Sequence, residues 1–423
     1  MRSLRSRRFR VWFIGGAVSN VGTWMQATAM NWVVLTVLTD HDATAMGFTM
    51  ALQFAPPLLL VSVAGWVADA VDRRLLLMMT QAASMMLAVS IGAMILADVL
   101  TQPMMYGFAL VLGIVIAFDG PARQAFVSDL VSWEDASNAI ALNAASFNGA
   151  RMIGPAIAGV LIVAVGTGWV FVINGVTFVA MLTALGVMGP GGPQRAGSAR
   201  PQQGFTAGVR YLAVRRDFVA LTVMAALIGA FGMNFAIMAS TMALEFERDA
   251  DGFGLLTSFV AVGAFVGALV AAQRTSARFH AVVTATGVMA VVATIGAFMP
   301  TYLGYALTLV VFGLALETMM TTANGYVQTR TPPELRGRVL ALYMAILVGA
   351  TPIGAPIVGW VAANLGARTA VLLSACAALA AFAVGVAWMV ASQSIRRHPS
   401  SRVRFVIHEP GINQQFEGRD AAA

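Results

Sequence analysis

Long apolar segments recur along the whole chain and constrain its fold more than any other feature. We identify twelve of them, at 11–38, 45–68, 75–97, 103–126, 139–165, 168–188, 218–243, 253–273, 281–299, 301–327, 339–364 and 368–391. One helix that crosses a bilayer needs about 20 apolar residues. Inside a bilayer the backbone polar groups must be satisfied within the segment, so we expect helices. The sequence therefore predicts an all-α membrane protein with twelve transmembrane helices.

The composition excludes a soluble globular enzyme. Hydrophobic residues make up 59% of the 423 residues and charged residues only 11%, against about a quarter charged in soluble domains. The net charge of +7 does not indicate nucleic-acid binding, because the arginines stand in short clusters between apolar runs. The single cysteine, Cys376, and four scattered histidines indicate neither a disulfide framework nor a metal site. We expect no enzymatic activity, no metal and no other cofactor.

Arginine is concentrated in alternate connections between the apolar segments. With the N-terminus inside, the outer connections carry only Arg248 and Arg368. The inner segments carry Arg2 to Arg10, Arg73, Arg74, Arg195, Arg200, Arg210, Arg215, Arg216, Arg274, Arg278, Arg330, Arg336, Arg338, Arg396 and Arg397. Membrane proteins retain their positive loops on the cytoplasmic side. We expect a multi-pass protein of the bacterial inner (plasma) membrane with both termini in the cytoplasm.

A segment rich in glycine, proline and serine divides the apolar segments into six and six. We assign residues 189–217 to a cytoplasmic linker, between an N-terminal six-helix bundle at 1–188 and a C-terminal one at 218–391. Residues 392–423 then form a cytoplasmic tail. Shifting the sequence by 200 residues aligns 11 identities within the 34 positions 126–159. Two related halves with the substrate site between them are typical of secondary transporters, so we predict two pseudo-symmetric bundles.

A motif between the second and third apolar segments points to a known family. It reads Gly65-Trp-Val-Ala-Asp69-Ala-Val-Asp72-Arg73-Arg74. This resembles the signature loop of the major facilitator superfamily, although Ala70 and Asp72 stand where the family usually has a basic residue and a glycine. The resemblance implies the major facilitator fold over essentially all twelve segments, and a gating motif in this loop.

The gating residues have physical roles that can be stated in advance. Gly65 permits close approach of a neighbouring helix, and Asp69 can face the N-terminus of a helix in the other half. Arg73, which Arg74 follows, can pair with an acid near the inner end of the fourth segment and lock the outward-facing state. We include Asp119 in this gate. The alternative is that Asp72-Arg73-Arg74 only sets the topology.

The fifth apolar segment carries a second motif. It reads Asn148-Gly-Ala-Arg151-Met-Ile-Gly154-Pro155-Ala-Ile-Ala-Gly159. With Asp119-Gly-Pro-Ala-Arg123-Gln and Ser128-Asp129-Leu130, it resembles the branch of enterobactin-type siderophore exporters and drug efflux proteins. Small residues at intervals of four allow close helix contact, so we interpret Gly149, Gly154, Pro155 and Gly159 as a helix-packing motif. Substrate contact is the alternative.

Four ionisable residues lie within the apolar segments, where charges are costly enough to indicate function. Arg151 either lines a cavity or is permanently paired with Asp119. Asp119 belongs to the gate, paired with Arg73 or Arg123, or else carries protons. Burial favours the neutral form of a carboxyl group, so Glu317 is our preferred proton-coupling acid, with a plain hydrogen-bonded glutamate as the alternative.

Uncharged polar side chains extend this pathway for substrate or protons. We include Asn20, Trp24, Asn31, Gln53, Asn148 and Asn234 beside Arg151 and Glu317. The leading hypothesis is a monomeric, proton-coupled exporter of amphiphilic small molecules of drug or siderophore type, which works by alternating access. Its partners are the small-molecule substrate, protons and the lipid bilayer. A proton-coupled importer of the same fold is the alternative, because architecture does not fix direction, and a transport-inactive scaffold or secretion-accessory protein is a further one.

Overall fold

The computed structural model describes residues 2–189, 205–272, 277–392, 395–397 and 405–407. Most of the predicted linker and tail lies outside these residues. Within them the chain is helical, apart from one antiparallel pair of short strands near the C-terminus, β1 (Ile395–Arg397) and β2 (Phe405–Ile407). The sequence did not predict these strands.

The N-terminal half is built from α1 to α7, and two of its helical segments are irregular. A π-helical turn extends α1, and a 56° bend separates α2 from α3. The elements are η1 (Ser3–Arg5), α1 (Arg7–Val33), η2 (Val34–Leu38), α2 (Ala43–Leu59), α3 (Val61–Ala70), α4 (Arg73–Leu96), α5 (Gln102–Asp129), η3 (Trp133–Asp135), α6 (Ala136–Val165) and α7 (Thr167–Val187). Two consecutive prolines, Pro56 and Pro57, remove backbone donors just before the α2–α3 bend.

The C-terminal half begins with a short helix, α8. Two of its helical segments are broken, at Asn234 and at Ala350. The elements are α8 (Phe205–Val214), α9 (Arg216–Leu227), η4 (Ile228–Gly232), α10 (Phe235–Glu245), α11 (Ala250–Ala272), α12 (Phe279–Ala297), α13 (Tyr302–Arg330), α14 (Pro333–Gly349), α15 (Thr351–Leu365) and α16 (Ala367–Ala391).

Ten helical segments of the described chain are long and apolar enough to cross a membrane, and the bent pair α2–α3 would make eleven. The segment missing from the predicted twelve is α1. Its 27 residues are long enough, but polar side chains such as Asn20, Gln26 and Asn31 lower its hydropathy. Length and composition therefore establish a polytopic helical membrane protein without establishing the count of twelve.

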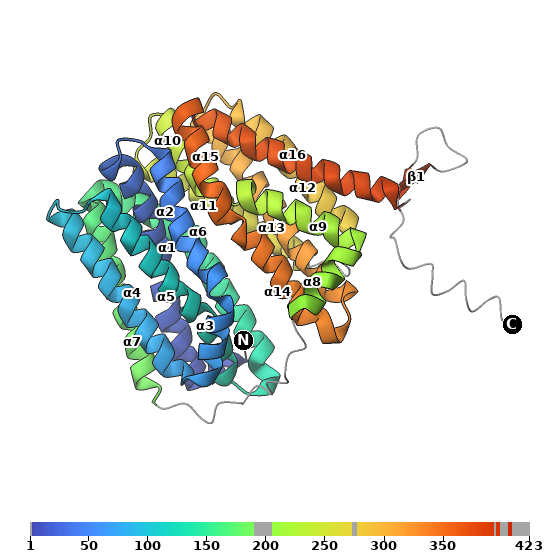
Figure 1. Cartoon of the computed structure of the whole chain (residues 1–423). Coiled ribbons are helices and arrows are strands. Elements are labelled where there is room, and N and C mark those ends of the chain that lie inside the picture. The colour runs from blue at the N-terminus through green and yellow to red at the C-terminus, as the bar shows by residue number, and fades with distance from the viewer. Residues whose placement is uncertain (1, 190–204, 273–276, 393–394, 398–404, 408–423) are drawn as a thin grey trace.

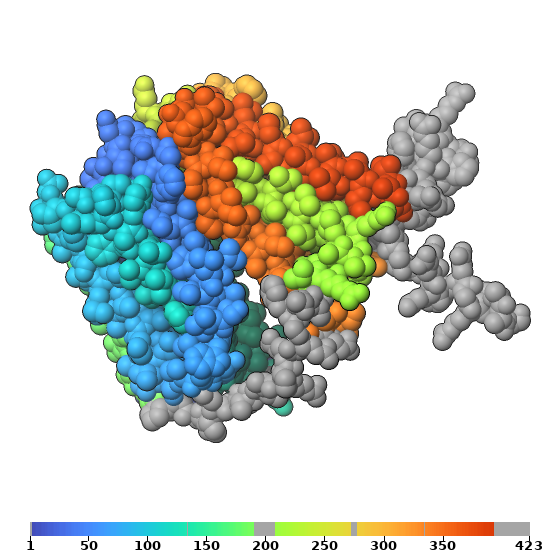
Figure 2. All heavy atoms as spheres, viewed as in Figure 1, coloured from blue at the N-terminus to red at the C-terminus, as the bar shows by residue number. Residues whose placement is uncertain are grey.

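The two halves touch along one end of the molecule and diverge towards the other (Figure 1). Between them, α2 packs against α15 and α6 packs against α11. We call the end with the α1–α2 connection the outer end, and the end with the α3–α4 loop and α8 the inner end. No helix of the C-terminal half packs against α3 in a comparable way within the described chain. Figure 2 shows the surface hollowed between the halves towards the inner end.

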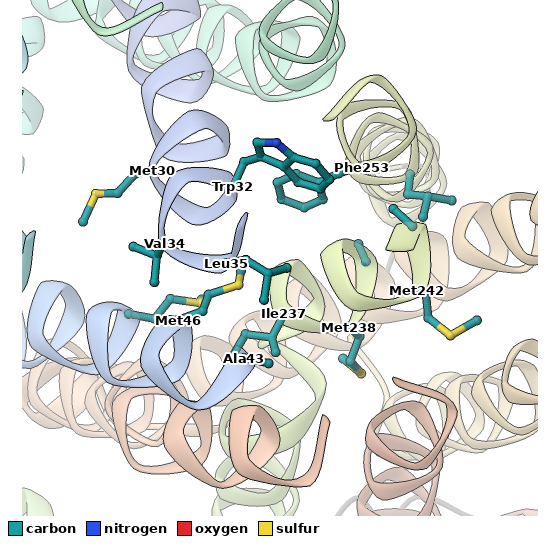
Figure 3. Close-up of a cluster of buried hydrophobic side chains, with 14 of the residues drawn as sticks. Met30, Trp32, Val34, Leu35, Ala43, Met46, Ile237, Met238, Met242 and Phe253 are labelled. Atoms are coloured by element: carbon teal, nitrogen blue, oxygen red, sulfur yellow. The ribbon is translucent and has the colours of Figure 1, made fainter. Parts of the chain in front are cut away.

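An apolar cluster closes the outer end (Figure 3). Trp32 of α1 stacks on Phe253 of α11, with ring centroids 6.0 Å apart and an interplanar angle of 17°. Such a pair contributes about 0.5–1.5 kcal/mol beyond its area burial. Met46 of α2 accepts a hydrogen bond on its sulfur from the Ser240 hydroxyl of α10 at 3.4 Å. Both of these contacts join the two halves, so the structure is closed at the outer end and open at the inner end.

Candidate functional site

An ion pair joins two helices of the N-terminal half at the inner end. Arg73 Nη1 lies 2.8 Å from Asp129 Oδ2, and Arg73 Nη2 lies 3.5 Å from Asp69 Oδ1. Asp129 is the last residue of α5, so Arg73 does pair with an acid near the inner end of the fourth segment. That acid is Asp129 rather than Asp119. The pair was predicted to lock the outward-facing state, but here it is formed while the inner end is open. Arg74 donates hydrogen bonds to the carbonyls of Leu185 and Gly186, which end α7.

Two expectations for the gating loop differ from the structure. The side chain of Asp69 is 76% exposed and faces no helix of the other half. A Cβ atom added to Gly65 would meet no heavy atom within 4 Å in the described chain, so the expected close helix approach is absent. Both observations have one physical reason, which is that the halves are apart at the inner end and leave this loop without a partner from the C-terminal half.

Asp119 sits in a closed hydrogen-bond network within the N-terminal half. Its Oδ2 accepts a hydrogen bond from Arg123 Nε at 2.8 Å, and its Oδ1 accepts from the Thr80 hydroxyl and from Gln81 Nε2, each at 2.8 Å. Arg123 also lies over the ring of Trp12, 5.6 Å from its centroid. Hydrogen bonds to both oxygens, one of them from a guanidinium, stabilise the ionised form of this carboxylate. The pairing with Arg123 is confirmed, and pairings with Arg73 or Arg151 are absent.

Arg151 has no such network. It forms no ion pair within the described chain, and its buried Nε has no hydrogen-bond acceptor. The guanidinium instead lies over two aromatic rings, 5.6 Å from the centroid of Trp24 and 5.9 Å from that of Phe235. The interpretation that Arg151 is permanently paired with Asp119 is therefore wrong. Because Phe235 belongs to α10, Arg151 of α6 reaches across to the other half.

Glu317 approaches Arg151 from the other half. It lies on α13, is partly buried, and its carboxylate accepts no hydrogen bond from the described residues. The charges of Arg151 and Glu317 act on one another without a direct ion pair of 4.0 Å or less. Gly267 of α11 makes room for Glu317, since a Cβ at Gly267 would lie 3.2 Å from the Cβ of Glu317. The two opposite charges thus lie in different halves and are close enough to influence one another.

The uncharged members of the predicted pathway divide into two groups. Asn234 is fully buried at the break between η4 and α10, where its amide donates to the carbonyls of Ala230 and Thr351. Asn148 donates to the carbonyl of Ala144 in its own helix at 3.0 Å. The Nδ2 groups of these two amides donate to backbone carbonyls, while the buried Oδ1 of Asn234 accepts no hydrogen bond within the described chain. Three others are partly buried and have no side-chain hydrogen bond within the described chain: Asn20, Asn31 and Gln53.

Trp24 is the aromatic partner of Arg151, and its own polar atom is unsatisfied. The indole Nε1 is buried and has no hydrogen-bond acceptor. Phe147 of α6 packs edge-on against the Trp24 ring at 5.6 Å between centroids. Neither Phe147 nor Phe235 was predicted from the sequence as part of this site. The spacing of four residues between Phe147 and Arg151 on one helix face was the available signal for the former, whereas Phe235 is in a different segment and has no local signal.

The helix-packing motif is correct for three of its four residues. A Cβ at Gly154 would lie 2.7 Å from the Cβ of Trp24, and one at Gly159 would lie 2.6 Å from the carbonyl oxygen of Ala250. The carbonyl of Pro155 meets Gly254 of α11. Gly149 was wrongly included, because a Cβ there would meet nothing within 4 Å in the described chain. Gly159 and Pro155 therefore allow α6 and α11 to cross closely at the outer end.

Residues 1–421 match the protein family described as transmembrane secretion effectors. The chain belongs to this family of major facilitator transporters. It is 24% identical over 332 residues to the staphyloferrin A transporter of Staphylococcus aureus, covering 77% of this chain and 82% of that one. It is 24% identical over 370 residues to the enterobactin exporter EntS of Citrobacter koseri, covering 84% and 86%. The family consists of multi-pass transporters rather than enzymes.

Solved structures show the same fold. A bacterial homologue of the human lysosomal transporter Spinster, in an inward-facing and occupied conformation, superposes with a TM-score of 0.72 at 14% identity, covering 94% of this chain and 99% of that one. A bacterial homologue of the iron transporter ferroportin in an inward-facing state gives 0.69 at 14% identity, covering 90% and 98%. At these identities the likeness concerns the fold alone.

Proposed function

We propose that this protein is a secondary active exporter of amphiphilic small molecules, driven by proton antiport across the bacterial inner membrane. In this proposal α1 is the twelfth span, and the chain forms two six-helix halves with both termini in the cytoplasm. The polar side chains that lower the hydropathy of α1 then belong to the interior of the transporter, where polar groups of a spanning helix are tolerated. The transporter works as a monomer.

One observation carries the proposal. Arg151 and Glu317 lie in opposite halves, are partly buried, and have no direct ionic or hydrogen-bonded partner in the described chain. Unpaired charges within a membrane are costly and persist where they serve a substrate or ion pathway. The apolar cluster around Trp32 and Phe253 separates this pair from the outer end. Breaking that cluster and closing the inner end would expose the same pair to the other side.

Export, rather than import, is supported by the relatives. The curated relatives include proteins named as exporters of enterobactin. We assign Glu317 as the coupling acid, because its carboxylate is free of hydrogen bonds, whereas both oxygens of Asp119 are occupied. A proton can drive the cycle only if its affinity differs between the inward-open and outward-open states. When the halves separate around Arg151 and Glu317, Glu317 loses the influence of the positive charge of Arg151. Its proton affinity then differs between the two states.

Transport into inverted membrane vesicles tests this function. With the vesicle interior made acidic, the wild-type protein should accumulate candidate dyes, drugs or siderophores, and dissipation of the gradient should stop accumulation. Glu317→Gln should abolish the gradient-dependent part, while the matched change at an exposed glutamate, Glu134→Gln, should leave it unchanged. Accumulation in right-side-out vesicles, or accumulation that ignores the pH gradient, would overturn the proposal.

A further inference from the structure

Five arginines stand close together at the start of the chain, at the inner end of the N-terminal half (Figure 1). They belong to η1, the residues beside it and the first turn of α1. All five side chains are exposed, and we call them the arginine cluster: Arg2, Arg5, Arg7, Arg8 and Arg10. Ser3 and Phe9, which lie between them, are fully buried. The stretch therefore packs on the protein through these two residues and presents its positive charges outwards.

Hydrogen bonds fix this stretch to the N-terminal half. The backbone nitrogen and the hydroxyl of Ser3 donate to Oδ1 of Asn138 on α6, at 3.2 and 2.6 Å. The Ser6 hydroxyl donates to the carbonyl oxygen of Leu130 at 3.0 Å and accepts from the backbone nitrogen of Phe9, which caps α1. A signal that sets membrane topology needs positive charge alone. It does not explain why these arginines have a fixed base, whereas a binding surface does.

The protein itself does not neutralise the arginine cluster. Four of its members form no ion pair within the described chain: Arg2, Arg5, Arg7 and Arg10. Asp129, the acid next to Leu130 in the chain, is paired with Arg73 instead. An exposed group of like charges is most stable beside a surface of opposite charge. The charge of the cluster therefore indicates an anionic partner outside the chain.

The C-terminal half contains an arginine in a comparable place that does have internal partners. Arg215 directly precedes α9 and donates to the carboxylate of Asp217. It also donates to the carbonyl oxygen of Arg330 at 3.1 Å. The shift of 200 residues that aligns the internal repeat places Arg330 at Leu130, whose carbonyl oxygen binds Ser6. Both halves thus fasten the start of their first long helix at equivalent carbonyls, but the N-terminal one uses a serine and leaves its arginines facing outwards.

From these observations we infer that the arginine cluster binds the phosphate groups of anionic phospholipids at the membrane surface. The apolar segment of α1 begins at Val11, directly after Arg10, so the cluster stands at the depth of the lipid headgroups. Groups of about four to eight basic residues beside a spanning helix attract anionic lipid, and guanidinium groups bind phosphate oxygens in pairs. Which leaflet supplies the lipid rests on the proposed cytoplasmic position of the N-terminus, whereas the binding does not.

The arrangement makes bound lipid an anchor for one half of the protein. Because η1 packs on α1 and α6, headgroups held by the arginine cluster fasten the inner end of the N-terminal half to the membrane surface. Arginine charges of the C-terminal half, such as that of Arg215, are held by protein groups instead.

Lipid titration of the detergent-purified full chain, followed by native mass spectrometry, tests the binding. The probes are dioleoylphosphatidylglycerol, which is anionic, and dioleoylphosphatidylcholine, which has the same acyl chains and no net charge. We expect the anionic lipid to bind at least about tenfold more tightly, because each arginine near an anionic membrane surface contributes about a factor of five in affinity. Inorganic phosphate added as a competitor should displace the lipid only weakly.

Two kinds of variant separate a built surface from diffuse charge. Arg7→Gln combined with Arg10→Gln should weaken phosphatidylglycerol binding by roughly twentyfold. The matched control combines Arg210→Gln with Arg216→Gln, which removes two exposed arginines from the inner end of the other half and should change binding little. Asn138→Ala retains every arginine but removes the acceptor of Ser3, and should weaken binding by roughly threefold. Size-exclusion profiles and thermal unfolding midpoints show whether each variant remains folded.

Several results would overturn the inference. These are equal binding of the two lipids by the wild-type chain, an equal loss of binding in the two double variants, and unchanged binding in folded Asn138→Ala. Full competition by inorganic phosphate would assign the arginine cluster to soluble anions instead of lipid. Any of these results with gradient-driven transport intact would refute the lipid surface alone. Normal lipid binding without gradient-driven accumulation in inverted vesicles would refute the proposed function instead.

Discussion

Two sets of opposite, partly buried charges in this protein are built in contrasting ways. Asp119 and Arg123 lie within one half, 2.8 Å apart, and the carboxylate also accepts hydrogen bonds from Thr80 and Gln81. Arg151 and Glu317 lie in different halves, with no direct ion pair and with an orphaned donor. A network in which every polar group is hydrogen-bonded stabilises one arrangement. A pair without hydrogen bonds keeps its donors and acceptors available for a ligand or a proton. The difference separates a structural charge site from a functional one.

The largest expected effect comes from neutralising the functional acid. Glu317→Gln should reduce proton-driven transport to background, because Gln cannot exchange a proton with the chamber. The thermal unfolding midpoint should stay within a few degrees of wild type, since the carboxylate has no hydrogen-bond partner to lose. Vesicle transport and differential scanning fluorimetry measure the two quantities. Normal proton-coupled transport by this variant would show that Glu317 is not the coupling acid.

The same chemical change at the structural acid should act on stability instead. Asp119→Asn leaves Arg123 without its counter-charge in a partly buried site, and should lower the free energy of unfolding by about 2–3 kcal/mol. Molecules that remain folded should still transport, because Asp119 faces no ligand in this account. A folded Asp119→Asn protein that has lost proton coupling would show instead that Asp119 carries protons.

Replacing each arginine by lysine sharpens the comparison further. Arg123→Lys loses the Nε hydrogen bond to Asp119 and should lower stability by about 1.5 kcal/mol. Arg151→Lys has no hydrogen bond to lose and should change stability by less than about 1 kcal/mol, the contribution of its ring contacts. Its effect should appear in ligand affinity. A stability loss at Arg151 as large as that at Arg123 would contradict the distinction.

The smallest effect should come from the inner-end ion pair. Asp129→Asn removes the partner of Arg73 at a site that is partly exposed to solvent, with 25% of the Asp129 side chain accessible. Screening limits such pairs to about 0.2–1 kcal/mol. Arg73 also has Asp69 within 3.5 Å, which retains part of the interaction. A loss above 2 kcal/mol would show that this pair is as structural as Asp119–Arg123.

The parts of the fold that depend on composition were predictable from the sequence. The parts of the site that depend on the spacing of residues along one helix were predictable as well. The apolar segments indicated a polytopic helical fold, and the spacing of Asp119 and Arg123 indicated their pairing. Relations between helices were not predictable. The partner of Arg73 at Asp129, the position of Phe235 beside Arg151, and the open space at Gly149 and Gly65 depend on helix rotation and on which end of the molecule is closed.

The alternating use of one chamber can be tested most directly at the outer end. Trp32 and Phe253 would be replaced by cysteine in a Cys376→Ser background and joined by a short, reducible bifunctional methanethiosulfonate reagent. The account predicts that cross-linked protein transports nothing in inverted vesicles and that reduction restores transport, since the outer end must open in every cycle. Undiminished transport by fully cross-linked protein would contradict it.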